Sequence, residues 1–322
     1  MRTRFDKWKT RVGACPVLIV LAASCIASPG WSQWLETLPP ELQKSVLWLG
    51  DHEEGDTSDW ANPAFQHHGG GIFNTGTATE AEAKASNEQA HSGEYSVKTT
   101  IRRAFQSQYG KKAVRLFRWT NRSWDDGGEF FPKEAYYSTW MYFPHTYNPD
   151  KSPPWDPGDG GWWNVFQFKS DDANGESQPI WNLHVDYDDE GDFMYFYLRT
   201  GANKPAGHYQ ALPRPIPVGR WFHVEAFYRQ SAQPTGEIQI WVDGEPTFSV
   251  ENVRTILSGQ VGWAVGNYTD HITGGPVDGE ASIYFDDAVV STERLSSKRG
   301  DLEVSNEIGA PGRPELNPLS TR

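Results

Sequence analysis

The chain has 322 residues, a formal net charge of −13 at pH 7 and 14% aromatic residues. This excess of acidic residues argues against nucleic acid as a partner, because the phosphate backbone is itself negative. The length fits one large domain better than two small ones. Beyond a leader at the N-terminus, no stretch approaches the roughly 20 apolar residues of a membrane-spanning helix, so we expect no membrane partner.

Residues 1–27 have the pattern of a secretory signal peptide, with basic residues first, an apolar run from about 14 to 27, and small residues next. Cleavage after Ala27 or a few residues later predicts a soluble secreted or periplasmic protein. A lipoprotein anchored at Cys25 is an alternative, although the usual aliphatic residue three positions earlier is missing. Cys15 and Cys25 both lie in the leader, so we expect no disulfide in the processed chain.

After a lead-in at 28–46, residues 47–295 are predicted to form one antiparallel β domain. Gly and Pro recur at short intervals there, and aromatic or β-branched residues alternate with polar ones. We expect helix only at 40–46 and near 80–85. The clearest strands are 136–143, 163–169, 181–187, 193–199, 221–229, 237–242, 262–268 and 281–290. So many strands predict an all-β fold, a two-sheet antiparallel β-sandwich of the jelly-roll type.

Two segments lack this alternation. The loop at 144–161, PHTYNPDKSPPWDPGDGG, is too long and too rich in Pro and Gly for a hairpin turn. Such loops often cover a binding site, and a disordered insertion is the alternative. From 296 to 322 the chain is polar and contains Pro, which predicts a flexible tail.

The segment at 162–187, WWNVFQFKSDDANGESQPIWNLHVDY, places four polar side chains between apolar neighbours: Gln167, Lys169, His184 and Asp186. Successive side chains of a strand point to opposite faces, so Gln167 and Lys169 project together, away from the flanking phenylalanines. Aromatic rings can stack on sugar rings, and an amide and an ammonium can bind the carboxylate of a uronate. The segment therefore predicts an acidic polysaccharide as ligand. An ordinary half-solvated strand is the alternative.

The domain also carries these blocks in order: LWLGDHEEGDTSDW, HSGEYSVKTTI, AVRLFRW, YYSTWMYFP, WNVFQFKSD, PVGRWFHVEAFYR, TGEIQIWVDGE, WAVGNYTD and IYFDDAVVS. Together, over about 47–291, they resemble the polysaccharide-lyase-like jelly rolls, the concanavalin-type sandwiches that include heparin lyase I, glucuronan lyases and alginate lyases. The resemblance implies a lyase that cleaves a uronic-acid-containing polysaccharide by β-elimination. The RWFHVE and VDGE blocks also occur in laminin-G-like sandwiches, so they support the fold more than the chemistry.

In the alginate-lyase-like branch the site is formed by an arginine-bearing strand, a Gln-x-His strand and a strand ending in Gly-x-Tyr. The resemblance therefore implies four catalytic residues here: Arg118, Gln167, Lys169 and Tyr268. Lys169 stands where the family pattern has a histidine. Around them, the expected substrate-binding residues are Arg115, Trp163, His184, Asp186 and Asn267.

Elimination beside a uronate requires a neutralised carboxylate, a base for the C5 proton and an acid for the leaving oxygen. Arg118 can bind the carboxylate, and Gln167 can add a hydrogen bond. Tyr268 can serve as acid, base or both, with a nearby cation stabilising its phenolate. Lys169 can be the base only if burial lowers its pKa. Arg115 and Arg118 are three residues apart, so at most one faces the site in a regular strand.

Acidic residues at both ends of the domain suggest a structural calcium ion, because calcium prefers carboxylate oxygens. The expected ligands are Glu54, Asp56 and Asp287, and solvated acidic turns are the alternative. We expect no organic cofactor.

Two other functions fit parts of the sequence. A non-catalytic carbohydrate-binding, laminin-G-like protein would use the same face without a base. A retaining glycoside hydrolase would need two carboxyl groups about 5–5.5 Å apart, for which Asp186 and Glu225 are the candidates. We expect a monomer with an acidic polysaccharide as its substrate.

Overall fold

The structure is a computed structural model that describes residues 32–60, 70–74, 81–102, 112–119, 131–147, 163–187, 193–201, 206–257, 261–269 and 280–296. All of these belong to one compact unit, Trp31–Arg322. The predicted signal peptide, most of the loop at 144–161 and all but the first residue of the tail at 296–322 lie outside the described residues. None of the described helices is long and apolar enough to cross a membrane.

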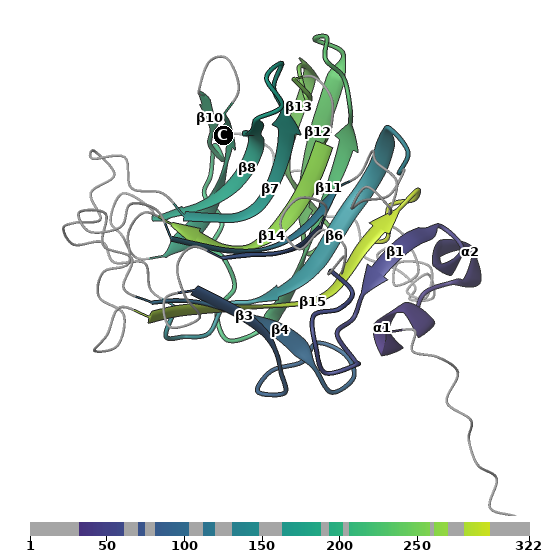
Figure 1. The fold of residues 1–322 in the computed structure, drawn as a ribbon, viewed down its shortest axis with the longest axis vertical. Helices are drawn as coiled ribbons and strands as arrows, with labels where there is room; N and C mark the ends of the chain where they lie inside the picture. Colours follow the sequence, from purple (N-terminus) through teal and green to yellow (C-terminus); the bar gives the residue numbers. More distant parts are fainter. Residues whose placement is uncertain are drawn as a thin grey trace, which may run out of the picture. The chain divides into compact units, whose positions relative to one another are not determined.

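The described strands form two antiparallel sheets, seen as two layers in Figure 1. The eight-stranded sheet has the order β13 (Glu245–Val253), β12 (Gly236–Val242), β11 (Trp221–Arg229), β6 (Glu134–Tyr142), β15 (Glu280–Ser291), β4 (Ser96–Arg102), β3 (Ala81–Ser86), with β1 (Val46–Gly50) also paired to β15. The seven-stranded sheet has the order β10 (Ala206–His208), β9 (Met194–Thr200), β8 (Ser177–Tyr187), β7 (Trp163–Asp171), β14 (Val261–Thr269), β5 (Lys112–Trp119), β2 (Gly70–Asn74). The predicted two-sheet antiparallel β-sandwich is confirmed.

All eight of the clearest predicted strands are present: they are β6, β7, β8, β9, β11, β12, β14 and β15. Several of the remaining strands, such as β1, β2 and β10, are five residues or shorter. Short strands offer too few alternating positions for the pattern to be seen in sequence.

The prediction of a helix near 80–85 is wrong, because this segment forms the strand β3. Its sequence AEAKAS consists largely of good helix formers, which misled the prediction. In the fold, Ala81 lies opposite Ile101 and Ala85 opposite Val97 on β4. Pairing with a buried strand outweighs the modest helix propensity of six residues. The helix expected at 40–46 is shorter, α2 (Pro40–Gln43), and β1 begins at Val46.

The core lies between the two sheets. Phe166 and Phe168 on β7 enter it together with Trp263 on β14. Phe168 stacks on Tyr228 of β11 in the other sheet, with ring centroids 3.8 Å apart and planes 10° apart. Because β7 commits its phenylalanines to the core, Gln167 must face the opposite side of the sheet.

A smaller apolar cluster joins α1 (Gln33–Glu36) and α2 to β15. Trp34 of α1 contacts Trp140 of β6 edge-on, with ring centroids 6.1 Å apart. Trp34 also lies 5.7 Å from the ring of His223 on β11. The N-terminal described segment thus covers part of the eight-stranded sheet on the side away from the main core.

His223 predicts a specific acid sensitivity. Its side chain is buried, and burial lowers its pKa to about 3, with a further lowering from the charge of His91. The unfolded chain takes up this proton first, so stability is lost as pH falls below about 6.5, by up to about 1.4 kcal/mol per pH unit. We expect His223→Phe to keep the aromatic packing and to make that loss shallower.

The measurement is urea unfolding of wild type and His223→Phe at a series of pH values from neutral to acidic. Parallel stability curves for the two proteins would show that His223 does not contribute to the acid sensitivity.

Candidate active site

Polar side chains gather on the side of the seven-stranded sheet that faces away from the core. We call this side the polar face. Strand register and alternation with core residues assign to it Arg115 and Phe117 of β5, Tyr268 of β14, Asn164, Gln167 and Lys169 of β7, Asn182, His184 and Asp186 of β8, and Tyr195, Tyr197 and Arg199 of β9.

A hydrogen-bonded network crosses the polar face from β7 to β9. Gln167 lies opposite Asn182, and its Nε2 donates to Asn182 Oδ1. Asn164 Nδ2 donates to the same oxygen at 3.1 Å and lies 3.4 Å from His184 Nε2. His184 Nδ1 is 2.8 Å from the Tyr197 hydroxyl. Gln167 and Lys169 project to one face as predicted, because Phe166 and Phe168 enter the core, and His184 lies on the same face.

Arg115 and Tyr268 form the other half of the site. The Arg115 guanidinium carbon lies 3.8 Å from the centroid of the Tyr268 ring. Gly266, opposite Arg115, makes this possible, because a Cβ there would lie 2.2 Å from the Val114 carbonyl oxygen. A side chain at 266 would push β5 away from β14 and separate the stacked pair.

Arg118 does not join this site, which corrects its predicted catalytic role. Its Nη1 donates to the Asp59 carbonyl at 3.0 Å, and its guanidinium carbon lies 4.7 Å from the Trp48 ring in the core. The pairing of β5 with β14 has no bulge, so residues three apart on β5 face opposite sides. Arg115, predicted to bind substrate, is the arginine on the polar face.

The substrate-binding roles predicted for Trp163 and Asn267 are also wrong, because both side chains point into the core. Trp163 Nε1 donates to Asn267 Oδ1 at 2.8 Å, and Asn267 Nδ2 donates to the Ala281 carbonyl of the opposite sheet at 2.9 Å. Asn267 follows Trp263 and Val265 by regular alternation along β14, so it faces inward and Tyr268 faces outward. On β7 the alternation shifts between Val165 and Phe166, which both enter the core, and this irregularity turns Trp163 inward.

The two candidate bases differ in charge. The pKa of Lys169 is lowered to about 8, mainly by burial and then by the charge of Arg115, against a smaller opposing effect of Asp171. Burial, then the charges of Arg199 and Arg115, lower the pKa of His184 to about 3. His184 is therefore neutral at physiological pH, and Lys169 loses its proton in mildly alkaline solution.

The register of β14 orders these groups along the polar face. Gly262 lies opposite Lys169, Ala264 lies opposite Gln167, and Tyr268 lies opposite Asn164. Gln167 therefore lies between Lys169 and Tyr268. Arg115 interacts with both of these residues: its guanidinium stacks on the Tyr268 ring, and its charge lowers the pKa of Lys169. Two groups suited to binding a carboxylate thus lie between two groups suited to moving protons.

The two carboxyl groups proposed for a retaining glycoside hydrolase, Asp186 and Glu225, are not paired in the structure. Asp186 is on the polar face, but Glu225 belongs to β11 in the eight-stranded sheet. The Glu225 carboxylate accepts hydrogen bonds from the backbone N–H of Leu295 at 2.7 Å and from Ser296. The two carboxyl groups lie on different sheets.

Sequence reasoning missed several members of the polar face, among them Asn164, Asn182, Tyr197 and Arg199. The signal was available for three of these four. Asn182 precedes His184 by two positions, and Tyr197 and Arg199 alternate with the core residues of β9. Asn164 was hidden by the irregularity between Asn164 and Phe166, which breaks simple alternation.

The predicted calcium ligands do not form a site. The side chains of Glu54 and Asp56 are exposed, whereas Asp287 is fully buried. Over the described ranges, no group of three or more His, Cys, Asp or Glu side chains is placed to hold a metal ion. A structural calcium ion stays a prediction without an identified set of ligands.

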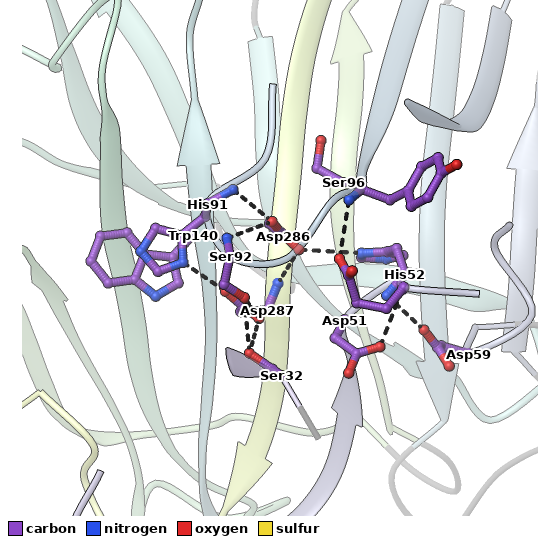
Figure 2. A network of polar contacts seen from close by, with 12 residues as sticks. Ser32, Asp51, His52, Asp59, His91, Ser92, Ser96, Trp140, Asp286 and Asp287 are labelled. Carbon is purple, nitrogen blue, oxygen red and sulfur yellow. Dashed lines mark hydrogen bonds and ion pairs between the residues drawn. The ribbon is translucent and has the colours of Figure 1, made fainter. Parts of the chain in front are cut away.

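Asp286 and Asp287 are instead the centre of a polar network in the eight-stranded sheet, shown in Figure 2. Asp287 accepts hydrogen bonds from Ser32 and from Ser92 Oγ at 3.0 Å, and its Oδ2 lies 2.6 Å from His91 Nδ1. The backbone N–H of His91 donates to Asp286 at 2.8 Å. These bonds tie the start of the described chain and the segment before β4 to β15.

The fold is a two-sheet antiparallel jelly roll, and polar side chains cover the outer side of its seven-stranded sheet. Residues 52–289 match the family model described as polysaccharide lyase. The chain therefore belongs to the polysaccharide lyase family, as the sequence blocks predicted.

Among solved structures, a fungal lyase supports the fold. An endo-β-1,4-glucuronan lyase from the fungus Trichoderma reesei matches with a TM-score of 0.53 and 15% identity, over 77% of this chain and 96% of that one. An alginate lyase from Aplysia kurodai has a TM-score of 0.45 and 10% identity, over 77% and 99%. One from Chlorella virus has 0.44 and 11%, over 69% and 91%. No curated protein sequence matches significantly.

The inward turn of Asn267 predicts a large stability effect. Asn267→Ala removes its bonds to Trp163, Thr99 and Ala281 and leaves buried polar groups without partners. We expect the free energy of unfolding to fall by about 2–4 kcal/mol, measured by urea unfolding.

The control is Asn174→Ala in the exposed turn between β7 and β8, which should change stability by less than about 0.5 kcal/mol. Equal effects of the two substitutions would contradict the inter-sheet role of Asn267.

Proposed function

We propose that this polysaccharide lyase is exported and cleaves a uronic-acid-containing polysaccharide by β-elimination. The observation that carries the proposal is the arrangement of Arg115 and Gln167 between Lys169 and Tyr268. The leader at 1–27 is the basis for export.

Arg115 neutralises the substrate carboxylate, and Gln167 adds a hydrogen bond through the second N–H of its Nε2, since the first is donated to Asn182. Arg115 is buried, and burial lowers its pKa to about 10, which leaves it charged at neutral pH. Its Nε has no hydrogen-bond partner in the part of the chain that the structure describes. A guanidinium offers paired donors to a carboxylate, and this interaction strengthens as charge moves onto the carboxylate during proton removal.

Lys169 removes the C5 proton in its neutral form. The electron pair left on C5 forms the C4–C5 double bond, and the bond from C4 to the glycosidic oxygen breaks. Tyr268 gives its proton to that oxygen, and the Arg115 guanidinium stabilises the resulting phenolate. The products are a shortened chain and a chain that ends in an unsaturated uronate.

The substrate is acidic although the protein is acidic too. Among its described residues the polar face carries three cations, Arg115, Lys169 and Arg199, against the carboxylate of Asp186. Local charge, more than net charge, sets the affinity for an anionic chain that binds along this face.

The first experiment follows the ultraviolet absorbance of the unsaturated product, with alginate, glucuronan and heparin as substrates. We expect turnover of at least one of them by the wild type and a fall of roughly 10²–10⁴-fold in kcat for Lys169→Ala and for Tyr268→Phe. Asn174→Ala is the control and should retain wild-type kinetics. No signal from any of the substrates would count against a uronate lyase.

The pH profile identifies the base. Since the Lys169 amine must be neutral, kcat/KM should rise about tenfold per pH unit and level off above pH 8, the value to which its pKa is lowered. A rate that stays flat from about pH 6 to about pH 9.5 would instead indicate His184, whose pKa of about 3 keeps it neutral throughout.

A further inference from the structure

The polar face continues past the proposed catalytic groups to an exposed aromatic residue, Tyr209, which follows β10. Tyr209 is 60% exposed to solvent. Its ring is nevertheless packed against a neighbouring side chain. It stacks on Tyr197 of β9, with centroids 5.2 Å apart and planes 11° apart.

Gly207 on β10 provides space for this ring. A Cβ at this position would lie 2.6 Å from Tyr209 Cε2, so only a glycine leaves room for the ring as it lies. One side of the Tyr209 ring is thus packed on Tyr197, and the residue stays largely open to solvent. An ordered aromatic surface of this kind suits the apolar face of a sugar ring.

The aromatic pair is continuous with the proposed active site. Tyr197 is 7% exposed, and its hydroxyl lies 2.8 Å from His184 Nδ1. His184 in turn lies 3.4 Å from Asn164, in the network that holds Gln167. Contacts therefore run without a break from Tyr209 to the residues that bind the reacting sugar.

Arg199 adds a cation next to this surface. It lies opposite Asn182 on one side and Gly207 on the other. Its side chain is partly exposed, and no hydrogen bond or ion pair with another described residue occupies its guanidinium. A guanidinium on the same side of β9 as an aromatic ring, without a partner among the described residues, is suited to a ligand that is both a sugar and an anion.

We propose that Tyr209 and Arg199 form a distal subsite that binds a uronate residue of the substrate chain. The ring of Tyr209 stacks on the sugar, and Arg199 binds its carboxylate. β10 lies three strands from β7, about 14 Å at the usual spacing between strands. One sugar cannot reach from Lys169 to Tyr209, so the enzyme holds a chain of several units. This inference rests on the proposed function, because it assigns the ligand of the same face.

The kinetic test uses Tyr209→Ala and Arg199→Gln in the full chain. With the polyuronate that is cleaved, we expect KM to rise roughly 5–20-fold and kcat to stay within about twofold. With the shortest oligosaccharide of that polymer that is still cleaved, KM should not change. Leu212→Ala, a change at an 84% exposed residue of the same segment, is the matched control and should leave all constants unchanged.

Unchanged KM for the polymer in both variants would overturn the subsite. An equal rise in KM for polymer and shortest substrate would also overturn it, because such a rise would mean a general disturbance of the site.

A binding measurement separates this inference from the proposed reaction. Calorimetry with alginate, glucuronan and heparin does not depend on turnover. If no polymer is cleaved but one binds, and Tyr209→Ala weakens that binding by a similar factor, the reaction is wrong and the subsite stands. If wild type and variant bind equally, or the wild type binds none of the three, the subsite is overturned.

Discussion

The pairing of β14 with its two neighbours is the constraint on which the proposed active site depends. Gly266 lets β5 approach closely enough for Arg115 to stack on Tyr268. Regular alternation along β14 places Asn267 in the core after Trp263 and Val265, and there it bonds to the opposite sheet. Because Asn267 is anchored inside, Tyr268 has to face out. A structural hydrogen bond between the sheets therefore orients the residue that we propose as the acid.

Charge on the polar face is arranged around Arg115. It is buried and stays protonated, and it acts on both sides, lowering the pKa of Lys169 and stacking on Tyr268. The same residue can thus bind a carboxylate, favour a neutral amine and stabilise a phenolate. A lysine in place of the family's histidine fits this setting, because burial and a neighbouring cation bring its pKa to about 8.

The polar residues of the two sheets have different roles. The seven-stranded sheet carries the polar face, and the eight-stranded sheet uses its buried polar groups for structure. Asp286 illustrates this second use. Burial raises the pKa of its carboxyl above the ordinary value, and its hydrogen bonds hold the segment before β4 in place. His223 is a similar case, buried against Trp34. Perturbed ionisable groups in this fold therefore do not all mark a catalytic site.

The sequence by itself determined the fold class and the face that carries Gln167, Lys169 and His184, because alternation along a strand is a local property with a period of two. It did not determine which arginine faces the site, or that Trp163 and Asn267 point inward. The orientation of Trp163 depends on an irregularity in β7, because one extra residue reverses every later side chain. The orientations of the arginines and of Asn267 depend on which face of β5 and β14 the opposite sheet covers. The distal pair of Tyr209 and Arg199 likewise became visible only once β10 was placed beside β9. Tertiary structure decided these points because they arise from contacts between distant parts of the chain.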